Sequence, residues 1–297
     1  MNFLARFFTG DKSLYKRFFI MTLTIALQNV IVTGVNLADN IMIGAYNQTA
    51  MSGIALVNQI QYLLHMIIMG VGEGIVIISS RYWGKRDVDG IKMVASVGAR
   101  VAVVCAALLW VTVFLFPSQV LRLFTTETAV IAEGAKYARI VCFSYPLFAV
   151  TTVLLATMRS VETVKIGFYV SLTAMFANII LNYLLIYGIG IFPELGSRGA
   201  ALATVVSRGA ELIVIAFYAA FNDKKLKLRL RDFLSFDREV VITYAKISLP
   251  LIASSAIWGV AQGTQAGILG RLGEETIAAN SIAATVFQII SDRKSVV

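Results

Sequence analysis

Charged residues, histidine, cysteine and proline are all scarce in this chain. Only 14% of its 297 residues are charged, and it has 1 histidine, 2 cysteines and 4 prolines. No His/Cys set with metal-ligand spacing, no paired catalytic acids and no nucleophile with a neighbouring base are visible, so an enzyme is not indicated. Cys105 and Cys142 both lie in apolar runs, which indicates inert buried thiols instead of a disulfide.

Hydrophobic residues dominate the composition. They make up 58% of the chain, and the mean hydropathy is +0.78, which predicts an all-α integral membrane protein. The apolar runs long enough to cross a bilayer are Phe18–Ala45, Met51–Ser80, Ile91–Phe116, Glu133–Thr157, Gly167–Ile191, Gly199–Phe221 and Val240–Gly270. A further run, from Thr276 to Ile290, is about 15 residues long and too short to span. We therefore expect the protein to continue beyond this C-terminus.

Basic residues orient these spans. The net charge is +9, and 19 of the 26 lysines and arginines fall at ends that share one side if the N-terminus is cytoplasmic and the spans alternate. The positive-inside rule then predicts a multi-pass protein of the cytoplasmic (inner) membrane with a cytoplasmic N-terminus. No cleavable signal peptide is evident, because the first apolar run is too long. The basic run Lys224–Arg231 is explained as an orienting loop, without nucleic acid.

Asp39 is an ionisable residue near the outer end of the first span, and such residues mark ion pathways or relays by default. At 1.5 Å per residue it lies about 9 Å below the outer surface, with Thr204 at about 8 Å, Asn182 at about 14 Å and Asn178 at about 20 Å. Asn178 and Asn182 share one helix face as i and i+4. Their oxygens would suit a hard cation or a protonatable carboxyl group. The alternative is that Asn and Thr only join helices through hydrogen bonds.

Other polar residues in the spans have simpler explanations. Glu73 and Arg100 are predicted at similar depth near the cytoplasmic end, and a structural pair is preferred over a second coupling site. Arg208 and Glu211 are i and i+3 and can neutralise each other. His65 is more often a helix contact than a proton relay. The roles of Glu73 and His65 stay open at this stage.

A weak internal repeat appears at a shift of 226 residues. Leu23–Gly44 falls on Leu249–Gly270, with leucine and glycine matched at the ends. Parallel repeats of six spans are a known transporter construction. We therefore predict an N-lobe of six helices over residues 1–221, a basic cytoplasmic inter-lobe loop over residues 222–239, and the start of a C-lobe over residues 240–297, with helix 7 and part of helix 8.

Four segments carry a family resemblance over nearly all of Leu14 to Ile290. They are LADNIMIGAYNQTAMSGIAL, SSRYWGKRD, NIILNYLLIYGIGIFPELGSRGAALATVVSR and GILGRLGEETIAANSIA. They resemble the multidrug and toxic compound extrusion (MATE) family, especially its bacterial NorM-like and DinF-like branches. The resemblance implies a twelve-helix, two-lobe antiporter that expels cationic or amphipathic compounds in exchange for Na+ or H+. It also implies that Asp39, Asn178, Asn182 and Thr204 form the N-lobe cation site.

The chain departs from the family pattern in two ways that bear on this site. Thr24 stands where a first-span proline is usual, and Asn182 replaces the aspartate of some branches, which leaves Asp39 as the only acid. We expect a monomeric exporter of small organic compounds in the lipid bilayer, with Na+ or H+ as coupling ion and no cofactor. The alternatives are a lipid-linked saccharide flippase, which would carry a more basic cavity, and a membrane-embedded enzyme or seven-helix receptor.

Overall fold

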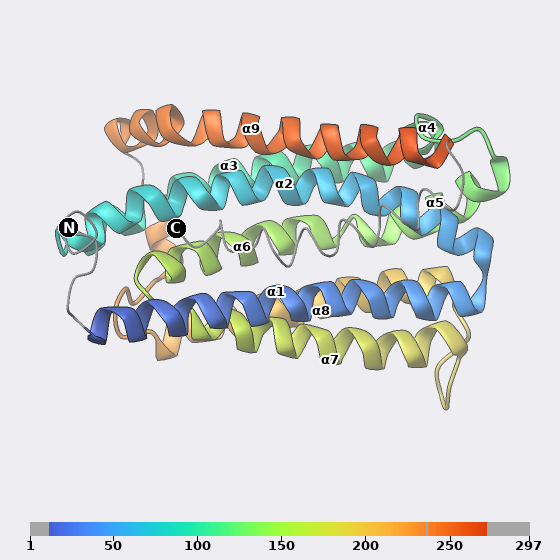
Figure 1. Cartoon of the computed structure of the whole chain (residues 1–297), viewed down its shortest axis with the longest axis horizontal. Coiled ribbons are helices and arrows are strands. Elements are labelled where there is room, and N and C mark those ends of the chain that lie inside the picture. The colour runs from blue at the N-terminus through green and yellow to red at the C-terminus, as the bar shows by residue number, and fades with distance from the viewer. Residues whose placement is uncertain (1–11, 236, 272–297) are drawn as a thin grey trace, which may run out of the picture.

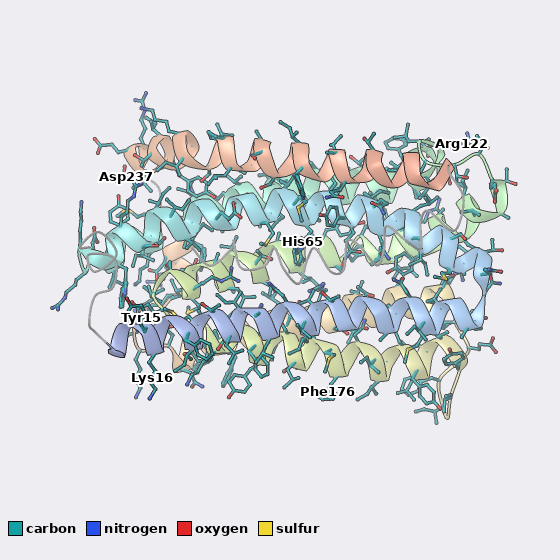
Figure 2. The ribbon with its side chains drawn as sticks, in the orientation of Figure 1. Tyr15, Lys16, His65, Arg122, Phe176 and Asp237 are labelled. Atoms are coloured by element: carbon teal, nitrogen blue, oxygen red, sulfur yellow. The ribbon has the colours of Figure 1, made fainter. Side chains whose placement is uncertain are left out.

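The computed structural model describes residues 12–235 and 237–271, and this part of the chain is a bundle of helices (Figure 1). The elements are α1 (Lys12–Tyr46), α2 (Gln48–Gly84), α3 (Val88–Leu115), α4 (Pro117–Arg122), α5 (Thr128–Val141), α6 (Ser144–Ser160), α7 (Lys165–Tyr187), α8 (Ser197–Phe217), η2 (Tyr218–Asn222), η3 (Leu230–Leu234) and α9 (Arg238–Arg271). η2 is a π-helical turn that extends α8, and η3 is a 3-10 helix. Lys16 and Asp237 lie at one end of the bundle and Arg122 at the other (Figure 2).

Six of these helices are long and apolar enough to cross a membrane, and α5 with α6 forms a seventh, bent span. The seven spans predicted from the sequence thus each have a counterpart in the described chain, and the all-α prediction is confirmed. The eighth run, Thr276 to Ile290, lies outside the described residues. α1 begins six residues before its apolar run, because charged residues such as Lys16 and Arg17 are compatible with a helix that extends into the headgroup region.

The fourth predicted span, Glu133–Thr157, is divided in the structure between two helices. α5 and α6 meet at an angle of 50°, and the break falls at Cys142 and Phe143. Pro146 explains its position, because a proline ring clashes with the carbonyl of the residue four positions earlier, here Cys142. Pro250, by contrast, lies inside the continuous helix α9.

α2 is the central helix of the bundle and packs against α3, α5, α6 and α9 (Figure 1). Its core face carries Val57, Ile68, Val71 and Ile75, none of which is exposed. On α7, by contrast, an apolar side chain faces outward: Phe176 is 54% exposed and points away from the bundle (Figure 2). Such apolar side chains on the outer faces suit a lipid environment, so the bundle is apolar both inside and outside.

The basic segment that links α8 to α9 is fixed against the end of the bundle where Lys16 and Asp237 lie. Lys225 donates to the carbonyl oxygen of Val161 and lies 5.4 Å from the centre of the Trp83 ring. Lys92 of α3 forms an ion pair of 3.2 Å with Asp232 of η3. These contacts connect this segment to α3 and to the end of α6. Specific side-chain contacts therefore fix its position, in addition to its net charge.

Arg100 takes part in the same connection. Its guanidinium donates to the backbone oxygens of Ser235, at 2.8 Å, and Phe233, at 3.3 Å. The charge of Arg159 of α6 acts on Glu73, but the two do not form one of the ion pairs found among the described residues. The structure therefore gives Arg100 backbone partners that the predicted Glu73–Arg100 pair did not include.

Gly53 of α2 sits where this helix touches α5 most closely. A Cβ atom at Gly53 would lie 2.7 Å from the backbone nitrogen of Gly134 and 2.9 Å from the carbonyl oxygen of Val130. Because both neighbours are backbone atoms, they cannot move aside as a flexible side chain would. The approach of α2 to α5 therefore requires glycine at this position.

Gly53→Ala should lower the free energy of unfolding by about 1–3 kcal/mol, because the added methyl group forces α2 and α5 apart. Thermal unfolding in detergent, followed by circular dichroism, measures the change. Gly209→Ala is the matched control, since a Cβ at Gly209 meets no atom within 4 Å. Equal stability of the two variants would contradict the assigned close approach.

Candidate functional site

The candidate site lies between α1 and α7, which run side by side through the bundle (Figure 1). Two hydrogen bonds of tyrosine hydroxyls fix the C-terminal end of α1. Tyr187 of α7 donates to the carbonyl oxygen of Met42 at 2.9 Å, and Tyr46 donates to Glu194 Oε1 at 2.9 Å. The two helices are therefore joined within two turns of Asp39.

Asn182 connects the polar residues at the centre of this contact. Its Nδ2 donates to Asp39 Oδ1 and, at 3.2 Å, to Asn178 Oδ1. Asn182 has no exposed surface, Asn178 is 3% exposed, and Asp39 is partly buried. The structure thus brings together three of the four residues singled out from the sequence.

The other half of the Asn182 amide has no partner. Its Oδ1 is buried and accepts no hydrogen bond from the described residues, although an amide oxygen has two lone pairs to satisfy. Both hydrogens of Nδ2 are used, so the amide orientation is determined by two acceptor oxygens. A rotation of this amide by about 180° would turn its free oxygen towards the oxygens of Asp39 and Asn178.

Thr204 is placed differently from the other three. Its Oγ1 donates to the carbonyl oxygen of Ala200 in its own helix, α8, at 3.0 Å. Tyr137 of α5, a helix that packs against α8, lies close enough to both Thr204 and Asp39 to interact with them. Tyr137 is 4% exposed, and it is a site residue that the sequence analysis missed.

Arg208 adds a positive charge one turn further along α8. Its Nη1 forms an ion pair of 2.7 Å with Glu211 Oε2, which was expected from the i, i+3 spacing. Its guanidinium also lies 5.2 Å from the centre of the Phe148 ring. The charge of Arg208 acts on Asp39, so the carboxylate has a cation nearby as well as an amide donor.

His65 of α2 reaches the same region from the other side. Its ring stacks on Phe148, with centroids 5.3 Å apart and an angle of 30° between the planes, and the charge of Arg208 acts on it. Phe148 therefore contacts both the His65 ring and the Arg208 guanidinium. A helix contact, the simpler of the two explanations considered for His65, accounts for this stacking.

The chemistry of the site follows from its atoms. One carboxylate, two amide groups and a nearby hydroxyl offer oxygen ligands, which hard cations prefer. In the described part of the chain, no three His, Cys, Asp or Glu side chains gather into a metal-binding group. The arrangement suits a singly charged cation or a proton better than a divalent transition metal.

The fold and this buried polar network define a multi-pass helical membrane protein with an ionisable site inside its bundle. A family model, MatE, matches residues 24–184, which is more than half of the chain. The protein belongs to the MatE family. The resemblance to multidrug and toxic compound extrusion transporters is thereby confirmed.

Similar proteins agree with this assignment. The chain is 25% identical over 281 residues to the probable multidrug resistance protein YoeA of Bacillus subtilis, covering 92% of this chain and 60% of YoeA. It is 28% identical over 206 residues to the probable multidrug resistance protein NorM of Thermotoga maritima, covering 68% of this chain and 43% of NorM. The chain thus spans about 60% or less of the length of these relatives.

Solved structures share the fold. The outward-facing conformation of a multidrug resistance MATE family transporter superposes with a TM-score of 0.82 at 20% identity, over 95% of this chain and 62% of that one. A transporter of the MOP superfamily from Pyrococcus furiosus gives a TM-score of 0.79 at 21% identity, over 92% of this chain and 60% of that one. At this identity the similarity establishes the fold alone.

A double-mutant cycle tests the Asp39–Asn182 hydrogen bond. Asn182→Leu should lower the free energy of unfolding by about 1.5–3 kcal/mol, because the carboxylate loses its donor. The same change in an Asp39→Leu background should cost clearly less. Thr173→Leu is a control on the exposed face of α7. Additive effects of the Asp39 and Asn182 changes in thermal unfolding would contradict the bond.

Proposed function

We propose that the complete protein is a cation-coupled antiporter that exports small organic compounds across the cytoplasmic membrane by alternating access. The observation that carries this proposal is the buried contact of Asp39, Asn182 and Asn178 between α1 and α7. An ionisable residue inside a membrane-spanning bundle is energetically costly, and such residues therefore mark functional sites by default. Membership of the MatE family and the relatives named as multidrug resistance proteins support the same class of activity.

The coupling cation would bind where Asn182 now donates. Either Na+ or H+ on Asp39 removes the need for the amide N–H and favours the rotated amide, whose oxygen then faces the cation or the acid proton. Asp39 supplies the charge, Asn178 and Asn182 supply neutral oxygens, and Thr204 with Tyr137 closes the side towards α5 and α8. Binding thus replaces a direct α1–α7 hydrogen bond with contacts through the cation.

This exchange links ion binding to helix packing. Because the bond joins α1 to α7, its replacement alters how tightly these helices are held, and such packed interfaces switch between discrete arrangements. A potential of 100 mV gives about 2.3 kcal/mol per charge moved inward. One cation could therefore sustain a substrate gradient of roughly 50-fold.

The topology completes the proposal. We infer a cytoplasmic N-terminus, an N-lobe that ends near residue 221, and a C-lobe that begins with α9. The contacts of the inter-lobe segment with α3 and α6 support a fixed connection at the cytoplasmic side. We also expect a monomer.

The flippase alternative would need a more basic cavity than the two arginines within the spans provide. Arg208 is paired with Glu211, and Arg100 donates to backbone oxygens. Both guanidinium groups thus already have partners within the protein, so neither is left available to bind a polyanionic head group.

Asp39→Asn in the complete transporter should abolish cation-dependent efflux while membrane insertion is retained, since the amide cannot carry the charge that binds the cation. Efflux of a fluorescent organic cation from cells, with Na+ and pH gradients varied separately, measures this. Asp89→Asn, at an exposed site in the first turn of α3, is the matched control. Unchanged efflux with Asp39→Asn would overturn the assignment.

Cation binding can also be measured on the chain described here. If Na+ is the coupling ion, NaCl should stabilise the wild type over choline chloride at equal ionic strength, by about 1.4 kcal/mol at a tenfold excess over Kd. If H+ is the coupling ion, the stabilisation should follow pH and ignore Na+. Either response should disappear in Asp39→Asn. A wild type that responds to neither ion would argue against a cation site in this lobe.

A further inference from the structure

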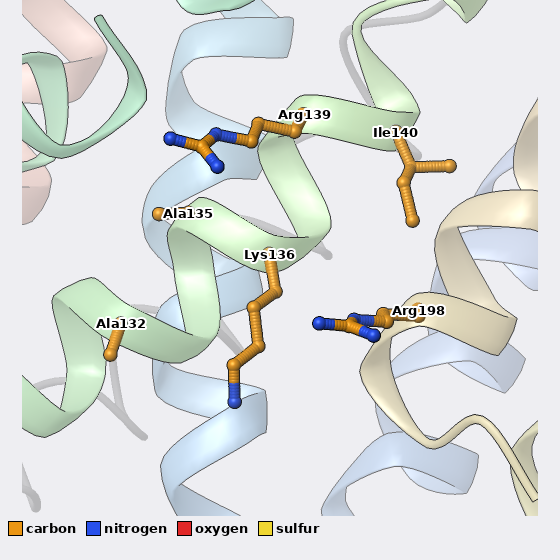
Figure 3. A pocket seen from close by; sticks show the side chains of 6 residues that line it. All are labelled: Ala132, Ala135, Lys136, Arg139, Ile140 and Arg198. Atoms are coloured by element: carbon orange, nitrogen blue, oxygen red, sulfur yellow. The ribbon is translucent and has the colours of Figure 1, made fainter.

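A second site lies at the outer end of the bundle, in an open cleft between α5 and α8. The cleft has a volume of ≈ 340 Å³ and is lined by Ala132, Ala135, Lys136, Arg139, Ile140 and Arg198. Figure 3 shows Lys136 on α5 and Arg198 extending towards it from α8, while Arg139 extends from α5 in a different direction. Half of the lining side chains are thus cations, and no carboxylate lines the cleft.

Nearby acids neutralise only part of this charge, because the ion pair of Glu133 accounts for Lys136 alone. Glu133 is shared between Lys136, at 2.5 Å from Oε1, and the Ser197 hydroxyl, at 3.0 Å from Oε2. Among the described residues no carboxylate forms an ion pair with Arg139 or Arg198. The cleft therefore keeps an excess of positive charge with two exposed guanidinium groups.

Basic residues are concentrated in this cleft although the chain carries few of them at this end of the predicted spans. In the predicted topology only five basic residues lie at the outer ends of the spans, namely Arg122, Lys136, Arg139, Arg198 and Arg271. Three of these five line this one cleft. Arg198 is the second residue of α8, whose N-cap, Gly196, offers no side chain to the first turn. The partial positive charge of the helix start adds to the same field.

The surface next to the cleft is apolar. One and two turns below Arg198 on α8, Leu202 is 37% exposed and Val206 is 51% exposed. One turn beyond Arg139, Phe143 is 45% exposed and packs edge-on against Phe114, with centroids 5.6 Å apart. A cationic cluster at headgroup level thus continues into apolar surface at the depth of the acyl chains.

We propose that this cleft binds the phosphate of an anionic phospholipid in the leaflet at that side of the membrane. Arginine suits this role because its guanidinium donates two parallel hydrogen bonds to phosphate oxygens. A free phosphate ion would use the same cations but not the apolar surface below them. The proposal concerns a lipid site and does not depend on transport.

Native mass spectrometry of the detergent-purified chain tests the site, with dioleoyl phosphatidylglycerol titrated against dioleoyl phosphatidylcholine. The wild type should prefer phosphatidylglycerol. Arg139→Gln and Arg198→Gln should each weaken its binding by about fivefold, as expected for one basic residue at a membrane surface, and together by more than tenfold. Arg122→Gln removes an outer charge away from the cleft and should leave binding unchanged.

A second variant fills the cleft without changing charge. Ala132 is exposed at its edge, so Ala132→Phe should fold and still reduce phosphatidylglycerol binding. Inorganic phosphate in millimolar excess should not displace the lipid. Equal lipid binding by wild type and all variants would overturn the proposal, and so would full displacement by inorganic phosphate, which would instead indicate a simple anion site.

Discussion

The hydrogen bond from Asn182 to Asp39 is the contact on which the interior of this bundle depends. A carboxylate placed between α1 and α7 must have a donor, because an isolated charge in an apolar interior costs many kcal/mol. Asn182 provides that donor and is itself held by Asn178, one turn away on the same helix face. The carboxylate therefore determines which face of α7 turns towards α1.

The surrounding helices maintain this geometry from the outside. Tyr187 and Tyr46 fix the C-terminal end of α1. The break before Pro146 directs α5 across the bundle, where Tyr137 lies close to Thr204. The close approach of Gly53 to α5 lets this tilted helix fit against α2. A straight fourth span would lack the bend that carries Tyr137 to this position.

The sequence was informative where periodicity and burial decide the outcome. Apolar runs predicted seven spans because a bilayer demands them, and the i, i+4 spacing of Asn178 and Asn182 predicted their shared face. Contacts between distant helices were harder. Tyr137 is one of 11 tyrosines, and its spacing does not reveal that it meets α8. Arg100 bonds to backbone oxygens of Phe233 and Ser235, which no pairing of opposite charges could have suggested.

The strength of the central bond also bears on how it could work as a switch. A hydrogen bond to a charged group contributes about 1.5–3 kcal/mol, and a membrane potential of 100 mV supplies about 2.3 kcal/mol per charge. Because the two are similar, the proposed cation at Asp39 would replace the Asn182 donor without a large net change in free energy. A much stronger contact, such as a buried ion pair between Asp39 and Arg208 of α8, would hold α1 in place at any physiological potential. The amide is thus weak enough to exchange and strong enough to keep the empty carboxylate buried.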